Sequence, residues 1–522
     1  MFFTLRLLIA NINGPLILPT SLQEKHRGQL MGEIGGKKPK VVIVGAGMAG
    51  LAAGRRLHAC AGDLLDIAVV EAGDRIGGRI LTSKFAGAQV EIGATWIHGI
   101  DGSPIYEIAR KAGALIPDDH ATSWERKDGF PSDPLTLGEG GLSIDPSLLS
   151  RISSVFSNLK DLIVSGKTNG EIASVGEFFR RGFESYRAEK HRADWMEEAA
   201  FAMHECGERT YTAVDDLESL DLAAEKEYCE FPGEHITLPG GYSRVPEFLA
   251  AALPLGTIRL RRKVSKVEWH PVGLAGRDPV RILYDDGEAE FADHVIITVS
   301  LGVLKAGVIN GDGLLFSPSL PEAKIHAIRR LGFGLVTKLF MELEGGEEEK
   351  SPFPYLRMAF DPSRQVAEIP RWIRRTDSIC PINRVSRVLL AWFVGREAAE
   401  VEKMDDDEII RGLHATLNGF SPPPAVDGGG YGRIARVRKS GWGKDPRFLG
   451  SYSYVAVGSS GDDQDALADP LPSDSSLSPL QILFAGEATH RTRYATTHGA
   501  YLSGLREADR LLRHYGIHSF KS

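Results

Sequence analysis

The chain has 522 residues, which is too long for one ordinary hydrophobic core and predicts two domains built from interleaved segments. Hydrophobic residues make up 43% and charged residues 25%, the balance of a globular protein. The formal net charge of −8 gives no support to nucleic-acid binding and is compatible with a cationic ligand. Four scattered cysteines, without C-x-x-C or other metal-ligand spacing, predict free thiols in a reducing compartment and no metal site.

We expect no targeting signal at either end of the chain. Asn11, Gly14 and Pro15 interrupt the apolar stretch near the N-terminus, so we expect neither a membrane span nor a signal peptide. Residues 1–37 are therefore predicted to be disordered or an extension. The final residues, Phe520 to Ser522, are not a peroxisomal address. We expect a cytoplasmic monomer without membrane or nucleic-acid partners.

The first strong structural signal is a βαβ unit. Lys40–Val44 (KVVIV) predicts a buried parallel strand because the run is short and β-branched. Leu51–Ala59 predicts a helix and Ile67–Glu71 a second strand, joined by a right-handed crossover.

The turn between the first strand and its helix carries G-x-G-x-x-G, at Gly45, Gly47 and Gly50, with Met48 and Ala49 between the last two. The first glycine makes the tight turn, the second lets backbone approach a pyrophosphate, and the third allows close packing of the helix. Glu71 ends the next strand, where a carboxylate accepts hydrogen bonds from ribose hydroxyls. Together these residues predict a dinucleotide-binding site on a helix N-terminus.

The following segment favours FAD over NAD. Gly77, Gly78 and Arg79 add a second glycine pair and a cation beside the predicted pyrophosphate, which suits the longer FAD molecule. Near the other end of the chain, Leu483–Glu487 (LFAGE) precedes a helix whose N-terminal amides can face the flavin O2 region, where negative charge grows on reduction.

The rest of the chain mixes helices and strands, and it shows no internal repeat. Residues 125–235 are predicted to be helical, above all in Ser174–Arg187 and Ala193–Met203. The acidic runs Glu342–Glu349 and Glu402–Glu408 are interpreted as solvated, and Ser421–Gly430 and Asp462–Ser478 as loops. Leu238–Tyr242 predicts a turn, Asp285–Gly287 a hairpin and Gly499–His514 a closing helix. Strands are predicted at Ile258–Val267, Val280–Tyr284, Phe291–Val299, Leu335–Glu342, Arg387–Val394 and Ile482–Phe484.

Eight blocks of sequence together resemble the flavin amine oxidase family, and within it the cytosolic-type polyamine oxidases of plants, which are associated with spermine and thermospermine. The resemblance runs from about Val41 to Leu512. Its blocks are VVIVGAGMAGLAA, EAGDRIGGR, GATWIHG, LPGGY, ADHVIITVSLGVLKAG, TKLF, GSYSY and FAGEATHRTRYATTHGAYLSG.

The resemblance implies an α/β fold, in which a Rossmann-like FAD-binding domain is interleaved with an α+β substrate domain carrying a mixed sheet. We assign 38–125, 236–310 and 440–515 to the FAD-binding domain, and 126–235 and 311–439 to the substrate-binding domain. The FAD is expected to be held non-covalently.

Two residues are predicted to be catalytic. Lys338 lies in an apolar strand, where a lysine is costly to bury unless it is paired or functional. In the family, the lysine of this block bridges through water to flavin N5 and assists reoxidation by O2. His98 lies in the block that lines the substrate tunnel. Some plant members carry glutamate there, so the histidine resembles the members that cleave polyamines back to smaller ones.

Other residues are predicted to bind substrate or cofactor. Tyr452 is one aromatic wall of the substrate channel. Thr496 stands where some members have tyrosine, and Ala495 where many have serine. Glu205 is a candidate carboxylate for a distal ammonium group. The predicted flavin contacts also include Gly93, Ala94, Thr95, Trp96, Val264, Trp442, Gly486, Glu487, Thr496 and Thr497.

The implied reaction is oxidation of a secondary amine by hydride transfer to the flavin, which gives an aldehyde, a shorter amine and, with O2, hydrogen peroxide. Alternatives on the same fold are a monoamine or amino-acid oxidase, a histone-lysine demethylase and an inactive flavoprotein scaffold. No cysteine follows Cys380, which disfavours the covalent flavin of monoamine oxidases, and Lys338 disfavours the scaffold.

Overall fold

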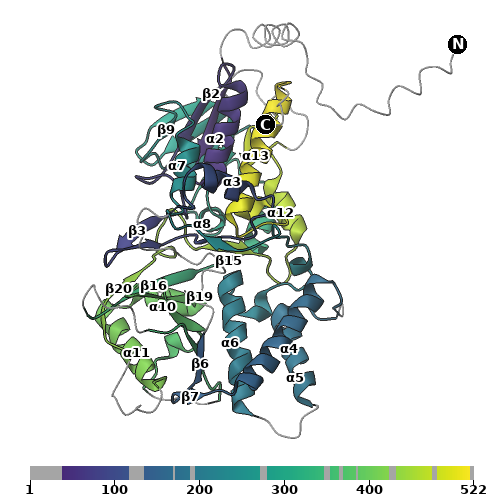
Figure 1. The fold of residues 1–522 in the computed structure, drawn as a ribbon. Helices are drawn as coiled ribbons and strands as arrows, with labels where there is room; N and C mark the ends of the chain where they lie inside the picture. The colour runs from purple at the N-terminus through teal and green to yellow at the C-terminus, as the bar shows by residue number, and fades with distance from the viewer. Residues whose placement is uncertain are drawn as a thin grey trace, which may run out of the picture.

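The structure is a computed structural model, and its chain forms two lobes stacked one above the other (Figure 1). The predicted extension at 1–37 lies outside the residues that the structure describes, as does most of the predicted loop Ser421–Gly430. The described residues are 38–116, 134–168, 171–188, 194–270, 279–345, 353–363, 368–383, 386–421, 431–472 and 479–517.

The upper lobe is organised around a five-stranded parallel sheet of order β22-β13-β1-β2-β9. The predicted βαβ unit is confirmed, since β1 and β2 pair in parallel and α2 connects them. The elements are β1 (Lys40–Val44), α2 (Met48–Ala61), β2 (Asp66–Val70), β9 (Ile258–Arg259), β13 (His294–Ile297) and β22 (Ile482–Phe484).

Alternate residues of β1 enter two different hydrophobic cores, as the two-residue period of a strand requires. Val41 and Ile43 pack on the face covered by helices α2, α3 (Pro104–Lys111), α7 (Arg244–Ala250) and α13 (Thr497–His514). Val42 and Val44 pack on the opposite face. Helix α13 lies beside α2, so the last helix of the chain covers its first strand (Figure 1).

The opposite face is covered by a four-stranded sheet of order β12-β11-β10-β14 and by helices. The hairpin predicted at Asp285–Gly287 is confirmed between β11 and β12, with Gly287 at φ +85°. The elements are β10 (Val264–Glu268), β11 (Val280–Tyr284), β12 (Ala289–Ala292), β14 (Leu315–Ser317), α8 (Leu301–Ile309) and α9 (Glu322–Arg330).

Two predicted strands are each divided between two sheets. The predicted strand Ile258–Val267 is broken because Arg261 adopts a left-handed conformation (φ +56°), which separates β9 from β10. The predicted strand Phe291–Val299 was also wrong as one element: its start belongs to β12, and the chain then crosses to the five-stranded sheet as β13. The crossing occurs at Asp293, a polar residue within the segment.

The lower lobe contains a seven-stranded mixed sheet of order β20-β16-β19-β18-β17-β6-β7. Helices α10 (Gly395–Lys403) and α11 (Asp406–Gly419) cover one face. The strands are β6 (Leu135–Gly138), β7 (Leu142–Ser143), β16 (Val336–Leu343), β17 (Leu356–Ala359), β18 (Ser378–Pro381), β19 (Val388–Val394) and β20 (Ile434–Lys439).

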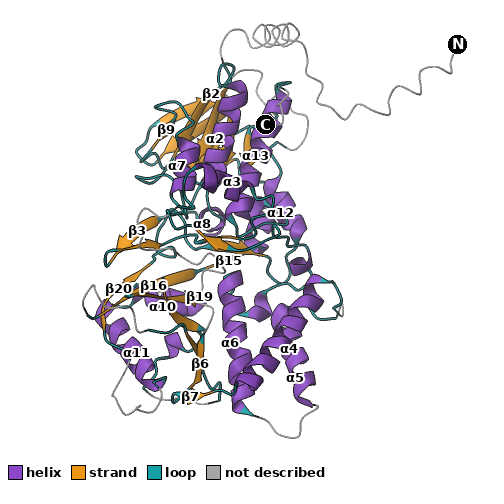
Figure 2. Ribbon diagram, in the orientation of Figure 1, coloured by secondary structure: helices purple, strands orange, loops and turns teal. Residues whose placement is uncertain are grey.

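Three helices form the second part of the lower lobe (Figure 2). They are α4 (Pro146–Val164), α5 (Val175–Ala188) and α6 (Trp195–Thr212), and their apolar faces share one core. The helices predicted at Ser174–Arg187 and Ala193–Met203 are confirmed as α5 and α6. The prediction of helix throughout 125–235 is wrong at β6 and β7, which add an edge to the mixed sheet.

Short ribbons and turns complete the fold. The ribbons are β3–β4 (Thr82–Phe85, Ala88–Glu91), β5–β8 (Trp96–Ile97, Ile236–Thr237) and β15–β21 (Gly332–Gly334, Tyr452–Tyr454). The 3-10 turns are η1 (Leu217–Ser219), η2 (Ala224–Lys226), η3 (Arg371–Ile373) and η4 (Glu487–Thr489).

Two predictions about polar segments need correction. The predicted loop Asp462–Ser478 begins with helix α12 (Gly461–Ala468), which a capping box between Ser460 and Asp463 initiates. Glu402 belongs to a run interpreted as solvated but is buried, where it accepts hydrogen bonds from Thr337 Oγ1 and Gly443 N.

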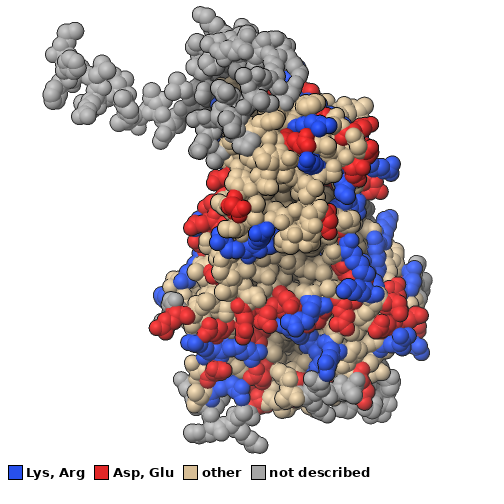
Figure 3. All heavy atoms as spheres, turned by 180° about the vertical axis from the view of Figure 1, so that it is seen from behind, with Lys and Arg blue, Asp and Glu red and all other residues tan. Residues whose placement is uncertain are grey.

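On the face of the molecule in Figure 3, acidic and basic side chains are interspersed. Among the described helices, none combines the length and apolar character needed to cross a bilayer. The domain limits drawn from the sequence stay a prediction.

Candidate active site

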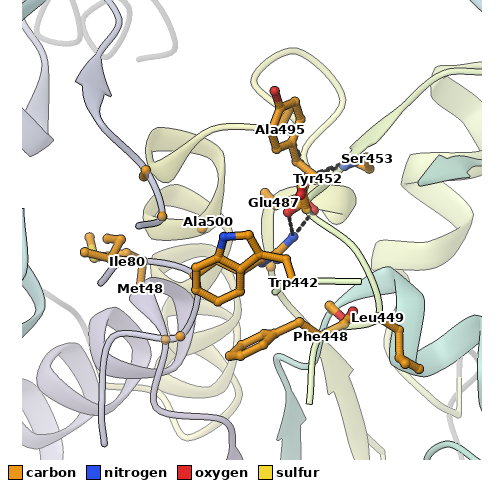
Figure 4. A pocket seen from close by; sticks show the side chains of 18 of the residues that line it. Met48, Ile80, Trp442, Phe448, Leu449, Tyr452, Ser453, Glu487, Ala495 and Ala500 are labelled. Atoms are coloured by element: carbon orange, nitrogen blue, oxygen red, sulfur yellow. Dashed lines mark hydrogen bonds and ion pairs between the residues drawn. The ribbon is translucent and has the colours of Figure 1, made fainter. Parts of the chain in front are cut away.

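A cavity of about 910 Å³ is lined by residues of both lobes. The structure brings to it every predicted site residue except Gly50 and Glu205. In the view of Figure 4, Trp442 stands in the middle, with Met48 and Ile80 to one side and Tyr452 and Glu487 to the other. Residues separated by most of the sequence thus line one space.

The glycine turn forms one wall of the cavity. Gly45 adopts φ +110°, and a Cβ there would lie 2.5 Å from Thr298 Oγ1. Gly50 does not line the cavity: a Cβ there would lie 1.9 Å from the carbonyl oxygen of Gly45, so its role is to let the helix pack on the turn. A Cβ on Gly47 would meet only Gly78 Cα, at 3.8 Å, so Gly47 leaves space on the cavity side.

Helix α2 begins in this wall and has no side-chain cap at Gly47, so its first amides are available to an anion. Glu71 lies beside them: its Oε2 accepts a hydrogen bond of 2.8 Å from Ala46 N, and its Oε1 accepts one of 2.8 Å from Gly73 N. Each carboxylate oxygen has a further lone pair, so Glu71 is positioned to accept ribose hydroxyls as well.

The C-terminal segment forms the adjoining wall. Glu487 Oε1 accepts a hydrogen bond of 3.0 Å from Arg79 Nη1, which also donates to the Ser451 carbonyl at 2.7 Å. Thr496 caps helix α13 by accepting a bond from Gly499 N at 3.0 Å. The first residue of α13, Thr497, lines the cavity, so the positive end of the helix dipole faces it.

Lys338 is buried on the cavity side of β16, the face it shares with Val336 and Phe340. Its ammonium donates hydrogen bonds to the carbonyl oxygens of Glu91 (2.8 Å) and Gly93 (2.5 Å) and to Thr95 Oγ1. Burial lowers the pKa of Lys338 to about 7, and the Glu91 carboxylate opposes that shift. An amine that titrates near neutral pH is suited to holding or moving a proton.

Aromatic side chains supply much of the remaining wall. Trp442 Nε1 donates to the Ile92 carbonyl at 3.0 Å, and the Tyr452 hydroxyl donates to the Thr210 carbonyl at 2.8 Å. Trp96 packs against Trp392, which sequence reasoning did not single out, with ring centroids 5.9 Å apart. Such walls exclude water and suit an aliphatic chain that carries ammonium groups.

His98 lines the cavity and is linked to two residues that the sequence analysis missed. His98 Nδ1 lies 2.9 Å from His235 Nδ1, and His235 Nε2 lies 3.5 Å from Glu230 Oε2. Potential metal-ligand atoms of all three residues lie within 4.8 Å of one another. The prediction of no metal site used sequence spacing, which does not reveal a group assembled across paired strands.

The cavity also contains a carboxyl group that the sequence analysis missed. Glu225 lines it, and the Tyr494 hydroxyl donates to Glu225 Oε1 at 2.8 Å. Desolvation raises the pKa of Glu225 to about 7. Tyr211 and Tyr228 lie in the same wall. Glu225, Tyr211 and Tyr228 lie outside the recognised sequence blocks, which explains why sequence analysis passed over them.

The predicted ammonium ligand Glu205 lies elsewhere. Its carboxylate pairs with Arg180 of helix α5, and it is not part of the cavity lining. Because Arg180 neutralises the charge that would attract a cation, the structure does not support the predicted role of Glu205.

The cavity fits an FAD molecule. Its volume lies at the upper end of the range for ligand sites, about 300–1,000 Å³. Two glycine turns leave backbone exposed beside a helix N-terminus, which suits a pyrophosphate, and Arg79 adds a cation. Lys338 and the N-terminus of α13 supply positive charge for a ring system that gains electrons.

Comparisons with known proteins agree with this geometry. The family model described as flavin containing amine oxidoreductase matches residues 48–512. Polyamine oxidase 1 of Oryza sativa subsp. japonica is 49% identical, over 92% of this chain and 98% of the relative. Probable polyamine oxidase 5 of Arabidopsis thaliana is 44% identical, over 92% of this chain and 99% of the relative.

Solved structures support the fold. An engineered putrescine oxidase superposes with a TM-score of 0.62 over 91% of this chain and 99% of that chain, at 18% identity. The chain therefore belongs to the flavin-containing amine oxidoreductase family, and it is an FAD-dependent oxidoreductase that acts on the CH–NH group of amines.

Proposed function

We propose that the protein is a polyamine oxidase that acts on a secondary amine of spermine- or thermospermine-type polyamines. It releases a shorter polyamine, an aminoaldehyde and hydrogen peroxide, in the back-conversion direction, and it works as a monomer in the cytoplasm. The observation that carries this proposal is the carboxyl group of Glu225, which shares an aromatic cavity with Lys338. A site for a simple monoamine needs no carboxylate to bind a further ammonium group away from the reacting carbon.

Two relatives at 49% and 44% identity carry polyamine oxidase in their names, and each aligns over nearly its whole length. His98 supports the back-conversion direction, because a neutral imidazole stands where some plant family members carry glutamate. The four cysteines are all free, as expected in a reducing compartment.

Each group of the cavity has a part in this reaction. A bound FAD would supply the hydride acceptor for the carbon next to the amine nitrogen. The side chains of Trp442 and Tyr452 orient the aliphatic chain and exclude water. Glu225 binds the distal ammonium, and His98 contacts the reacting amine. Lys338 holds or moves a proton beside the flavin ring.

Product analysis tests the proposal. Purified holoenzyme is mixed anaerobically with spermine, thermospermine or N-acetylated analogues, and loss of the flavin absorbance is followed. We expect bleaching by a polyamine, and after admission of air, spermidine and hydrogen peroxide from spermine. Release of 1,3-diaminopropane instead of spermidine would overturn back-conversion, and bleaching only by monoamines would overturn the polyamine assignment.

A further inference from the structure

Three side chains form a connected row from the surface to the cavity. The side chain of Glu230 is 29% exposed and that of His235 is 37% exposed, and both His235 and His98 line the cavity. The ribbon β5–β8 aligns them: Ile97 pairs with Ile236 in an antiparallel register, so His98 and His235 form the next cross-strand pair. The row is therefore built into the fold by strand register.

The positions of the protons follow from the chemistry of the row. A carboxylate only accepts hydrogen bonds, and Glu230 Oε2 lies 3.5 Å from His235 Nε2, so its charge favours the proton on that nitrogen. A neutral His235 then has a lone pair on Nδ1. The contact of 2.9 Å between the two Nδ1 atoms requires one proton, which must come from His98.

We propose that His235, oriented by Glu230, is a positioning residue that holds His98 in the tautomer protonated on Nδ1. The Nε2 lone pair of His98 is then left to accept a hydrogen bond from an N–H of the substrate amine. The opposite tautomer would present a donor, which cannot accept a hydrogen bond from that N–H. This inference rests on the proposed function only in naming the amine as the group bound.

The surroundings of His98 favour its neutral form. Burial lowers its pKa to about 4, which leaves the imidazole uncharged at neutral pH. Besides His235 and Glu230, the ionisable groups that act on it are Tyr211, whose ring lies edge-on at 5.7 Å, and His498. Burial lowers the pKa of His498 to about 3, so His498 is also neutral. Trp96 packs at 6.5 Å.

Glu230 is itself held in place, because the Tyr211 hydroxyl donates to its Oε1. The other carboxylate oxygen is thereby directed to His235. Glu230 thus orients the His235 ring, and His235 in turn orients the His98 ring. A carboxylate fixes the orientation of a catalytic histidine in the same way.

Paired substitutions at His235 test the proposal. His235→Leu removes the acceptor for His98 and is expected to lower kcat/KM for spermine by roughly 10- to 100-fold, the usual cost of losing such an orienting partner. His235→Asn keeps an acceptor at nearly the same place and is expected to retain most of the activity. His326→Leu is the matched control, because His326 Nε2 also lies 3.5 Å from a glutamate, Glu322, on the exposed side of α9.

Nitrogen NMR of the resting holoenzyme, labelled with 15N-histidine, gives a readout that needs no substrate. The His98 signals, identified by their loss in His98→Gln, are expected to show a protonated Nδ1 and an unprotonated Nε2. In His235→Leu the two tautomers are expected to mix, whereas Glu230→Gln should shift the balance less.

The outcomes separate the possibilities. A wild-type His98 protonated on Nε2, or equal damage by His235→Leu and His235→Asn, would overturn the proposal. A change of the His98 signals on adding EDTA, reversed by Zn2+, would also overturn it, because the three residues would then bind a metal. The expected NMR result in an enzyme that oxidises no polyamine would instead refute the proposed function and leave the tautomer assignment standing.

Discussion

The Arg79 guanidinium donates a hydrogen bond of 3.0 Å to the Glu487 carboxylate across 408 residues of sequence. Glu487 is 4% exposed and also accepts bonds from the backbone N and Oγ of Ser453 and from Ala495 N. One carboxylate therefore joins the second glycine turn, ribbon β15–β21 and the segment before α13 at the cavity.

Replacing Glu487 should therefore loosen the fold as well as the cofactor site. We expect Glu487→Ala to lower the free energy of unfolding by about 3 kcal/mol, because removing one partner strands a largely buried cation and three polar groups. Denaturant unfolding of the holoenzyme and apoenzyme measures the loss. Asp509→Ala breaks the more exposed pair with Arg56, which has a distance of 2.8 Å, and should cost about 1 kcal/mol or less. Equal losses in the two variants would contradict this account.

The glycine turn offers a test that separates cofactor binding from folding. Gly47 has an ordinary φ of −81°, and its added Cβ would have only one ordinary contact within the protein. We expect Gly47→Ala to leave the unfolding free energy of the apoenzyme within about 0.5 kcal/mol and to weaken FAD binding by at least about tenfold. Flavin fluorescence on titration with FAD measures the affinity.

Gly50→Ala is the matched variant, because the added Cβ would lie 1.9 Å from the Gly45 carbonyl oxygen. It should destabilise the apoenzyme itself by roughly 1–3 kcal/mol or more, since the helix must move off the turn. If Gly47→Ala destabilised the apoenzyme as much as Gly50→Ala, the assignment of Gly47 to the pyrophosphate wall would be wrong.

Local pattern was enough to predict the parts of the fold that depend on short-range signals. The strand–turn–helix around Gly45, the hairpin at Gly287 and the amphipathic helices α5 and α6 carry their own turn residues and periodicity. Local pattern failed where the conformation depends on a partner or on one residue's backbone. β6 is a strand because β17 pairs with it in parallel, and Arg261 interrupts the segment Ile258–Val267 through its left-handed backbone conformation.

The residues of the candidate site were likewise predictable from the sequence only in part. Lys338 could be predicted because a lysine within an apolar strand is conspicuous, and the structure places it among carbonyl oxygens at the cavity. Glu205 could not be excluded from sequence, since Arg180 reaches it from another helix. Glu225 lies in the short 3-10 turn η2 and His235 immediately before β8, and only the fold brings them to the cavity.

Lys338 provides a test of charge beside the flavin. Since its pKa is lowered to about 7, the side chain is an ammonium below pH 7 and a neutral amine above it. We expect reoxidation of the reduced holoenzyme by O2 to slow as pH rises through about 7, because the positive charge is lost. In Lys338→Met the rate should fall by roughly 100-fold and lose this pH dependence. Stopped-flow mixing with O2 at pH 6 and pH 8.5 measures both.

Lys324→Met is the control for the effect of replacing a buried lysine that lies outside the cavity. Its ammonium donates to three backbone carbonyls at 2.7–2.9 Å, and burial lowers its pKa to about 7, but it does not line the cavity. Lys324→Met should lower the melting temperature without changing the reoxidation rate. A similar slowing in both variants would assign the effect of Lys338 to folding.

The raised pKa of Glu225 leads us to predict how substrate binding depends on pH. Because desolvation raises its pKa to about 7, the carboxyl is protonated below pH 7 and ionised above it. We therefore expect kcat/KM for spermine to fall as pH drops below about 7 in the wild-type enzyme, as the anion that binds the distal ammonium is lost. Glu225→Gln should raise KM by roughly 10- to 100-fold at pH 8, the worth of about 1.5–3 kcal/mol for a hydrogen bond to a charged group.

Glu205→Gln distinguishes this assignment from the one suggested by sequence. Its carboxylate is paired with Arg180 away from the cavity, so the substitution should leave KM and its pH profile close to those of the wild type. A rise in KM with Glu205→Gln, together with no effect of Glu225→Gln, would reverse the assignment. Measuring KM for a monoamine in parallel isolates the effect of the distal ammonium. Glu225→Gln should not weaken binding of a substrate that has no second ammonium, because that substrate makes no contact with Glu225.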